Sequence, residues 1–299
     1  MSDRDATERR PDIKIEDIPY RTMGDRALLA RIYRPAGAGP FPAVIDIHGG
    51  AWTSGDRTQN EAIAMAFAES GIVVVAIDFR MPPEGRYPDS LADINVAIRW
   101  LKSRAGEFGT RADWIGGFGT SSGGHQILLA AMRPADPRYA ALPLPGALET
   151  DARLAYVVSG WGVLEPLLRY RLAKERGNRH FVESHDAYWG SEAAMSDGSP
   201  PLILERGELV DLPPALIFQG TADEWVPEAL TRRFAESYRR AGGEMELVLL
   251  EGANHSFYRE EPNGANARQA IAAVIDFIRR QTSQRRELRP AAKSLSSRG

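Results

Sequence analysis

A serine, an aspartate and a histidine occur along this chain at positions where they could act as nucleophile, orienting acid and base. Ser121 lies in residues 119–123, Gly-Thr-Ser-Ser-Gly, which have the pattern Gly-x-Ser-x-Gly. A serine hydroxyl is a weak nucleophile at neutral pH, so it needs an imidazole to take its proton and a carboxylate to orient that imidazole. The flanking glycines would allow a tight strand-to-helix turn without Cβ clashes. The pattern alone also occurs in turns where the serine only caps a helix, so its partners must be found elsewhere.

His255 is the predicted base and Asp223 the predicted acid. His255 follows the expected strand that ends at residue 250 and precedes the last expected helix. The acid should follow the preceding strand, where Asp223 and Glu224 are both available. We favour Asp223 because it ends the turn that begins at Gly220 and would face the histidine loop. The resulting order of nucleophile, acid and histidine is the one found in α/β-hydrolases.

A second glycine-rich segment could supply the N–H groups that bind a developing oxyanion. His-Gly-Gly-Ala-Trp, residues 48–52, follows the expected strand 43–47. Fixed N–H dipoles in a site closed to water stabilise such a charge without reorganisation. We expect Gly50 and Ala51 to be donors, Gly49 to allow close backbone approach, and the Ser122 N–H to complete the oxyanion hole.

Alternating strands and helices must position these residues. Strands are expected at 13–18, 28–33, 43–47, 72–77, 114–118, 155–159, 215–218 and 246–250, and helices at 59–70, 91–104, 122–132, 227–241 and 265–280. Continuous β-branched runs such as residues 72–75 are typical of parallel strands buried on both faces. The alternation predicts an α/β fold with a mostly parallel central sheet and helices on both faces. The first two or three strands, joined by short links, could be antiparallel.

Residues 161–208 interrupt the alternation and are too long for a simple crossover. We expect them to form an inserted cap over the carboxyl edge of the sheet, where open α/β sheets bind ligands. The domain then covers residues 13–280, with mobile tails at 1–12 and 281–299. Aromatic residues near that edge are expected to wall the substrate pocket. They are Trp52, Trp161, Trp189, Trp225 and Phe257, of which Trp52 and Trp161 are the first choices.

Composition indicates an ordinary globular protein and argues against several partners. The 299 residues are 43 % hydrophobic and 26 % charged, which is consistent with one domain and a sizeable core. A net charge of -3 offers no basic field for nucleic acid. No run approaches the ~18 apolar residues that span a bilayer. Residues 1–10 do not resemble a secretory signal, so a cytoplasmic location without a membrane partner is expected.

No metal or other cofactor is expected. The chain has no cysteine, which excludes a disulfide, a thiolate zinc site and a cysteine nucleophile. His180 and His185, in the insertion, have no flanking carboxylates at metal-ligand spacing. Any catalysis should therefore rest on the serine, acid and histidine described above.

Taken together, these motifs resemble the hormone-sensitive-lipase-like esterases and the shorter bacterial feruloyl and acetyl esterases. The resemblance extends from about residue 40 to 280 and rests on residues 48–52, 78–84 with 87–88, 119–123, 220–223 with 226–227, and His255. It implies an α/β-hydrolase fold, a serine carboxylesterase that forms an acyl-enzyme on small esters, no cofactor, and often a homodimer. It also implies that His48 holds its loop by hydrogen bonds rather than transferring protons. The compact insertion favours short or medium acyl chains.

Three residues depart from the family pattern and leave substrate preference open. Ala51 replaces a third glycine, Thr120 replaces an acidic residue, and Ser122 replaces a common alanine. The same triad could cleave amides or carbamates, and no residue decides between these and esters. A non-catalytic small-ligand receptor, like the plant gibberellin receptor on this scaffold, would predict a degraded triad, whereas this chain keeps all three members.

Overall fold

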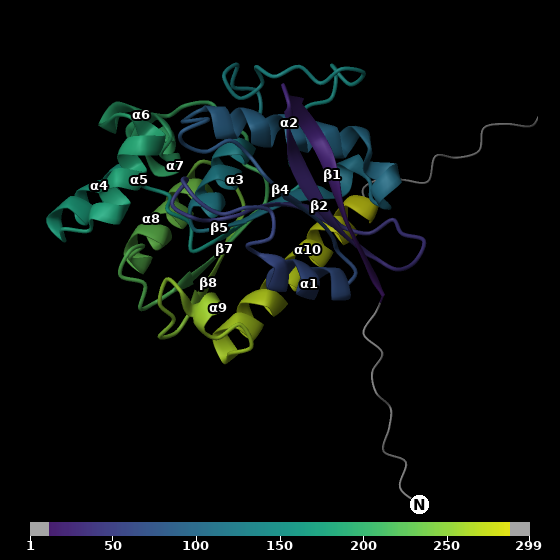
Figure 1. The fold of residues 1–299 in the computed structure, drawn as a ribbon. Helices are drawn as coiled ribbons and strands as arrows, with labels where there is room; N and C mark the ends of the chain where they lie inside the picture. The colour runs from purple at the N-terminus through teal and green to yellow at the C-terminus, as the bar shows by residue number, and fades with distance from the viewer. Residues whose placement is uncertain (1–11, 288–299) are drawn as a thin grey trace, which may run out of the picture.

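A computed structural model describes residues 12–287, in which a central sheet lies between two layers of helices (Figure 1). Residues 1–11 and 288–299, most of the two predicted tails, lie outside the described residues. The sheet order is β1-β2-β4-β3-β5-β6-β7-β8. The strands are β1 (Ile13–Met23), β2 (Arg26–Pro35), β3 (Ala43–Ile47), β4 (Val73–Ile77), β5 (Ile115–Thr120), β6 (Val157–Gly160), β7 (Ala215–Gly220) and β8 (Met245–Leu250).

The strand directions confirm the predicted mostly parallel sheet. β1 pairs antiparallel with β2, and β2 with β4, while every pairing from β4 through β3 to β8 is parallel. All eight expected strands are present. β1 continues five residues beyond the predicted end at 18, because hairpin pairing with β2 holds residues that carry no apolar run.

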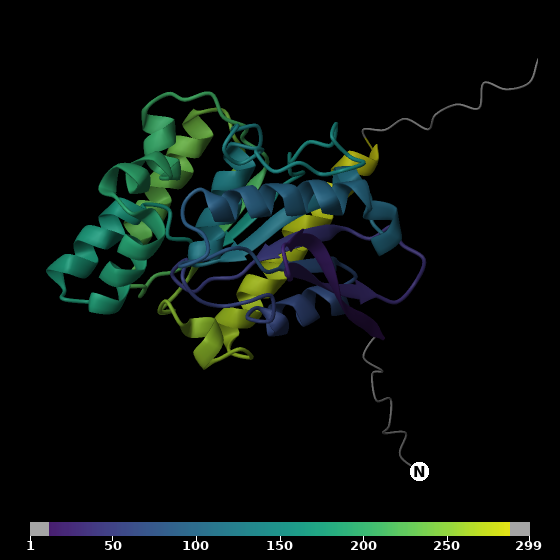
Figure 2. The same cartoon turned by 45° about the horizontal axis from the view of Figure 1, so that its top comes forward.

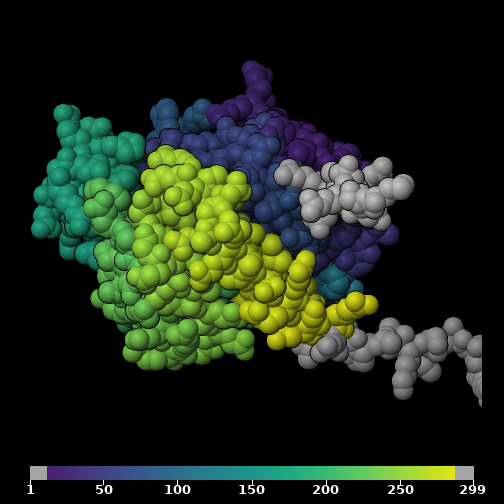
Figure 3. Space-filling model, turned by 90° about the horizontal axis from the view of Figure 1, so that it is seen from below, coloured from purple at the N-terminus to yellow at the C-terminus, as the bar shows by residue number. Residues whose placement is uncertain are grey.

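Side chains of the central strands alternate between two hydrophobic cores, one on each face of the sheet. On β3, Ile45 and Ile47 join the core formed with α2 (Asp89–Ser103), α3 (Ser122–Met132) and α8 (Glu228–Arg240). Val44 points the other way, into the core formed with α1 (Glu61–Glu69) and α10 (Ala265–Glu287). Figure 3 shows yellow α10 beside the dark-blue segment that holds α1. Successive side chains of a strand point to opposite faces of the sheet, so a strand covered on both faces needs apolar residues at successive positions.

The end predicted for the last helix, residue 280, was wrong, because α10 continues to Glu287. Gln281 and Thr282 are buried. Arg285 Nη2 donates a hydrogen bond to the carbonyl oxygen of Ala155, at 2.7 Å. These tertiary contacts hold helical turns that the polar sequence alone does not predict.

Four helices lie within the interval predicted to form the cap: α4 (Pro166–Glu175), α5 (Arg179–Trp189), α6 (Glu192–Asp197) and α7 (Pro200–Glu205). They form a group to one side of the sheet, teal and green in Figure 2. Tyr170 and Tyr188 of these helices pack with Trp52, Val163 and Val226 in a third hydrophobic cluster. Those three partners follow β3, β6 and β7, so this group lies against the carboxyl edge of the sheet. Within residues 12–287, no helix has the length and apolar character to cross a membrane.

Candidate active site

Ser121 occupies a sharp turn between β5 and α3. Its backbone φ of 53° lies in the left-handed region, which residues other than glycine seldom adopt. The neighbouring glycines make the turn sterically possible. A Cβ on Gly119 would lie 2.5 Å from the carbonyl oxygen of Gly123, and one on Gly123 would lie 2.0 Å from that of Ile47. This strained turn presents the serine hydroxyl at the end of the sheet.

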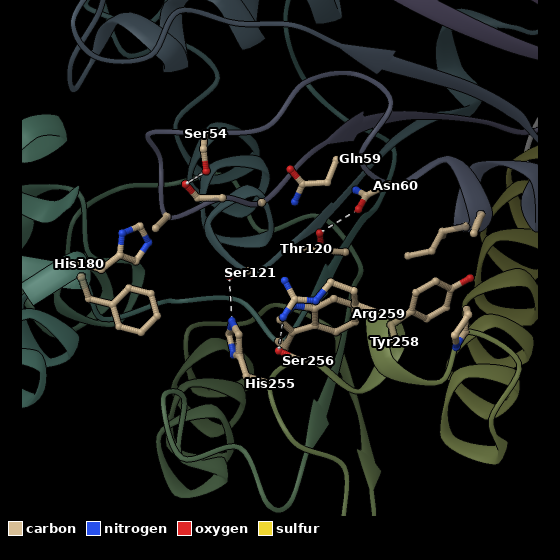
Figure 4. A pocket seen from close by; sticks show the side chains of 18 of the residues that line it. Ser54, Gln59, Asn60, Thr120, Ser121, His180, His255, Ser256, Tyr258 and Arg259 are labelled. Carbon is tan, nitrogen blue, oxygen red and sulfur yellow. Dashed lines mark hydrogen bonds between the residues drawn. The ribbon is translucent and has the colours of Figure 1, made fainter. Parts of the chain in front are cut away.

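A continuous hydrogen-bond chain joins the three residues predicted to form the triad (Figure 4). Ser121 Oγ lies 3.0 Å from His255 Nε2, and His255 Nδ1 lies 2.7 Å from Asp223 Oδ2. Asp223 has a fully buried side chain, whereas Glu224 is 72 % exposed and lies near Arg176. The geometry therefore favours Asp223 as the orienting acid and does not bring Glu224 to the histidine.

Asp223 is held as a carboxylate by donors on both of its oxygens. Oδ1 accepts from the main-chain N–H groups of Trp225 and Val226, both at 2.9 Å. Burial alone would raise the pKa of Asp223. The hydrogen bond from His255, the charge of His255 and the hydrogen bond from the Val226 amide outweigh burial and hold that pKa below its ordinary value. An ionised acid in this position stabilises an imidazolium at His255.

Gln219 is a supporting residue that the sequence analysis missed. It is the residue before the last of β7, it is fully buried, and its Nε2 lies 3.0 Å from Asp223 Oδ2 and 3.1 Å from the Val226 carbonyl oxygen. The same amide therefore orients the acid and closes the loop that carries it. The sequence signal that could have found it is a polar residue directly after the apolar run Ala-Leu-Ile-Phe, residues 215–218.

The glycine-rich segment after β3 lies beside the serine, as predicted. Gly49, Gly50, Ala51 and Ser121 line one cavity. Gly50 has a φ of 103°, and a Cβ there would lie 2.0 Å from the carbonyl oxygen of Ser54. Among the described residues, the N–H groups of Gly50 and Ala51 donate to no turn or loop carbonyl. They are thus available to an oxyanion.

Thr120 and Ser122, two of the residues that depart from the family pattern, connect the serine turn to the chain that follows β3. Ser122 is fully buried, and its Oγ accepts a hydrogen bond from the Trp52 N–H at 3.2 Å. Thr120 Oγ1 donates to Asn60 Oδ1 at 3.2 Å, and Asn60 Nδ2 donates to Asp46 Oδ1 at 2.8 Å. Neither hydroxyl is placed to compete with Ser121.

His48 is buried beneath the same loop. Its Nδ1 lies 2.8 Å from the carbonyl oxygen of Gly49, and its ring stacks on Phe79 with centroids 4.4 Å apart. Burial lowers its pKa, so the ring is neutral at pH 7. These contacts match a residue that holds its loop.

The triad opens into a cavity of about 820 Å³ between the sheet edge and the cap helices. Figure 4 shows Ser121 near its centre, with His180 on one side and Tyr258 and Arg259 on the other. Lining side chains include Trp161, Arg169, His180, Phe181, Ser256, Tyr258 and Arg259. A cavity of this size is typical of a small-molecule site.

Of the five aromatic residues predicted to line this pocket, only Trp161 does so among the described residues, and the other four placements were wrong. Trp52 and Trp189, the last residue of α5, are 1 % and 4 % exposed and pack edge to face in the third hydrophobic cluster. Phe257 packs behind Trp161, with centroids 4.9 Å apart. Trp225 lines a separate cavity of about 220 Å³. Packing of the cap helices against the sheet edge buries the rings of Trp52 and Trp189, whereas Phe257 belongs to the core formed with α1 and α10.

The remaining histidines of the cap interface serve packing. His125 and His185 are fully buried, and burial lowers the pKa of each to about 4, so both are neutral at pH 7. The part of the chain that the structure describes contains no group of three or more His, Asp or Glu side chains placed to hold a metal ion.

Comparisons with known proteins agree with this geometry. Residues 31–238 match the family model BD-FAE, and residues 199–282 match that of the dienelactone hydrolase family. The probable carboxylic ester hydrolase LipM of Mycobacterium tuberculosis is 31 % identical over 255 residues, which are 80 % of this chain but 54 % of LipM. The chain thus spans about half the length of that relative.

Solved structures show the same fold. Thermogutta terrifontis esterase 2 with bound propionate superposes with a TM-score of 0.66 at 29 % identity, covering 90 % of this chain and 93 % of that one. The same esterase phosphorylated by paraoxon gives a TM-score of 0.68 at 27 % identity, covering 88 % and 92 %. The predicted α/β-hydrolase fold is thereby confirmed.

Proposed function

The chain belongs to the BD-FAE family and has the α/β-hydrolase fold, and from this premise we propose that it is a serine carboxylesterase that hydrolyses small esters with short or medium acyl chains. The observation that carries the proposal is the hydrogen-bond chain from Ser121 through His255 to Asp223. It ends in a cavity that Gly50 and Ala51 also line.

In the proposed reaction, Ser121 Oγ attacks the ester carbonyl carbon while His255 Nε2 takes the hydroxyl proton. The carbonyl oxygen becomes an oxyanion that the N–H groups of Gly50, Ala51 and Ser122 stabilise. Collapse of the tetrahedral intermediate breaks the bond to the alkoxy oxygen, and His255 returns the proton to the departing alcohol. Water, deprotonated by His255, then attacks the acyl-enzyme and releases the carboxylic acid.

The size of the cavity supports small substrates. Trp161 and Phe181 of α5 line the same cavity as Ser121. The Thermogutta esterase binds propionate, which is the acid expected from a short-chain ester. We expect kcat/KM to be highest for acyl groups of about two to six carbons.

The test compares aryl acetate, butyrate, hexanoate and decanoate hydrolysis by the wild type and by Ser121→Ala. Loss of the nucleophile should lower kcat by roughly 10⁴-fold or more. Paraoxon, which phosphorylates the Thermogutta esterase, should add one phosphoryl group to the wild type and none to Ser121→Ala by intact mass. A folded wild type inactive on all four esters would contradict the proposal.

The amide alternative is separated by matched ester and anilide substrates with the same acyl group. An esterase should favour the ester strongly, and an amidase should retain comparable kcat on both. The receptor alternative predicts ligand binding with no activity that depends on Ser121.

Two further sequence predictions stay predictions. A homodimer should appear as twice the mass of 32.9 kDa in sedimentation equilibrium. A cytoplasmic location should place the native protein in the soluble fraction of its source cells.

A further inference from the structure

Arg169 on α4 is buried at the wall of the cavity that holds Ser121. It is 4 % exposed and borders both this cavity and the apolar one beside Trp225. Its guanidinium lies over the ring of Phe181, with 3.9 Å from Cζ to the ring centroid. The charged end of the side chain is therefore held within the cap, next to the proposed site of chemistry.

The guanidinium of Arg169 forms no ion pair with any described residue. Within residues 12–287, Nε and Nη1 are buried without a hydrogen-bond acceptor, and no carboxylate lies within ion-pair distance. Glu165, one turn earlier, is paired with Arg233 instead. Arg80 and Arg133, two partly buried arginines, are each paired with carboxylates, and the buried Arg99 donates to Asn95 Oδ1 and the Leu142 carbonyl oxygen. A buried cation without a counter-ion is costly, so its retention points to a ligand.

Arg169 keeps its charge in this position. Burial lowers its pKa to about 10, with the charge of Asp223 opposing that effect. It is therefore protonated at neutral pH. The face of Phe181 stabilises the cation but does not neutralise it.

The cavity as a whole suits an anion. Arg169, Arg259 and His180 line it, while no Asp or Glu from the described residues does. Asp223 lies behind His255, with both carboxylate oxygens already accepting hydrogen bonds. Such a surface raises the local concentration of negatively charged substrates.

We propose that the ester cleaved here carries a second, free carboxylate, and that Arg169 binds this carboxylate. The inference rests on the proposed esterase function and specifies its substrate class. The shared chemistry covers monoesters of dicarboxylic acids and esters of alcohols that bear a carboxylate. A carboxylate is favoured over a phosphate because one guanidinium neutralises one charge, whereas a phosphate dianion would remain half-compensated in a buried site.

The test uses two pairs of substrates that match in shape and differ in charge. In the first pair, monoethyl succinate carries a carboxylate on the acyl side and ethyl 4-methylpentanoate is its neutral counterpart. In the second pair, acetylated 4-hydroxybenzoate carries the carboxylate on the alcohol side and acetylated 4-isopropylphenol is its neutral counterpart. For each pair, the ratio of kcat/KM for the charged ester to that for the neutral one is measured in wild type, Arg169→Met, Arg169→Lys and Arg171→Met.

Arg169→Met should lower the charged-to-neutral ratio at least about tenfold for one pair, mainly through KM. The pair that responds identifies the side on which the carboxylate lies. Arg169→Lys should fall between Met and wild type, since it keeps the charge but loses the planar fork. Arg171, an exposed arginine of the same helix that pairs with Glu192, is the matched control, and Arg171→Met should leave both ratios unchanged.

An unchanged ratio for both pairs in folded Arg169→Met and Arg169→Lys would overturn the inference. Equal loss for charged and neutral esters, with a shifted pH profile, would instead show that Arg169 acts on Asp223 by its charge. If Arg169→Met does not fold, Arg169→Lys decides the question alone. Wild type that hydrolyses only neutral esters defeats this inference but not the proposed function, whereas no hydrolysis of any of the four defeats both.

Discussion

Ser122 Oγ accepts the main-chain N–H of Trp52 at 3.2 Å, so the residue after the nucleophile fastens the loop that carries the proposed oxyanion donors. The loop depends on this bond because Ala51 and Trp52 both have positive φ, 51° and 63°. Such conformations persist only when the surrounding structure holds them. A hydroxyl beside the nucleophile thus has a structural partner of its own.

Ser122→Ala should loosen this loop without removing any proposed catalytic group. The buried Trp52 N–H would lose its acceptor, which we expect to cost about 1–3 kcal/mol of unfolding free energy. We expect kcat to fall by roughly tenfold, with less change in KM, as oxyanion stabilisation weakens. Urea unfolding measures the free energy of unfolding, and ester kinetics measure kcat and KM. Ser103→Ala, at a residue that bonds the Trp100 carbonyl away from the site, serves as control.

Asp223→Asn should lower kcat by roughly 10⁴-fold, because an amide no longer selects the His255 tautomer that accepts the serine proton. Glu224→Gln, a matched change at the exposed neighbour, should leave kcat within about twofold. Initial rates on one ester distinguish the two carboxylates. Comparable losses in both variants would argue against the assignment of Asp223.

Asp46→Asn should stabilise the protein at alkaline pH. Burial raises the pKa of Asp46 to about 7, although the Asn60 amide partly opposes this effect. A carboxyl group whose folded pKa exceeds its unfolded value contributes stability at low pH and loses it as pH rises from about 4 through 7. The asparagine resembles the protonated acid, so its advantage should be small at pH 4.5 and reach roughly 2–4 kcal/mol at pH 8.

Denaturant unfolding at pH 4.5, 6 and 8 measures this difference. The exposed Asp25, in the turn between β1 and β2, provides the matched Asp25→Asn control, which should show no such trend. A pH-independent difference between Asp46→Asn and wild type would refute the predicted titration.

Gly123→Ala should prevent the serine turn from forming. The new Cβ would meet two backbone carbonyl oxygens, those of Ile47 at 2.0 Å and His48 at 2.4 Å. Because backbone cannot yield as a side chain can, we expect a loss of about 3 kcal/mol or more, together with activity. Gly106→Ala is the control, since a Cβ there meets nothing within 4 Å. Thermal unfolding of both variants tests the contrast.

Local patterns predicted the elements well but their ends less well. Continuous apolar runs such as Val73–Ile77 identify buried strands because both faces of a parallel strand must be apolar. The last turns of α10 escape such reasoning, since Arg285 is held there by the carbonyl oxygen of Ala155, 130 residues earlier in the chain. A polar helix end has no local signal for a contact of that range.

The pocket shows the same limit more strongly. Trp52 and Trp161 both follow strands at the carboxyl edge, yet Trp161 borders the cavity while Trp52 is enclosed by the cap. Position on a loop tells which edge a residue lies near but not the direction of its side chain. That direction depends on how the cap helices pack.

The sequence by itself determined the α/β class, the strand order along the chain, and the candidates Ser121, Asp223 and His255, because periodicity and small residues at sharp turns are local properties. Only the tertiary structure brought these three side chains into one hydrogen-bond chain, added Gln219 behind the acid, and buried Arg169 with no ion pair to the residues that the structure describes. These relationships join residues from separate strands and from the cap. They are decided by packing of distant segments, which no local pattern encodes.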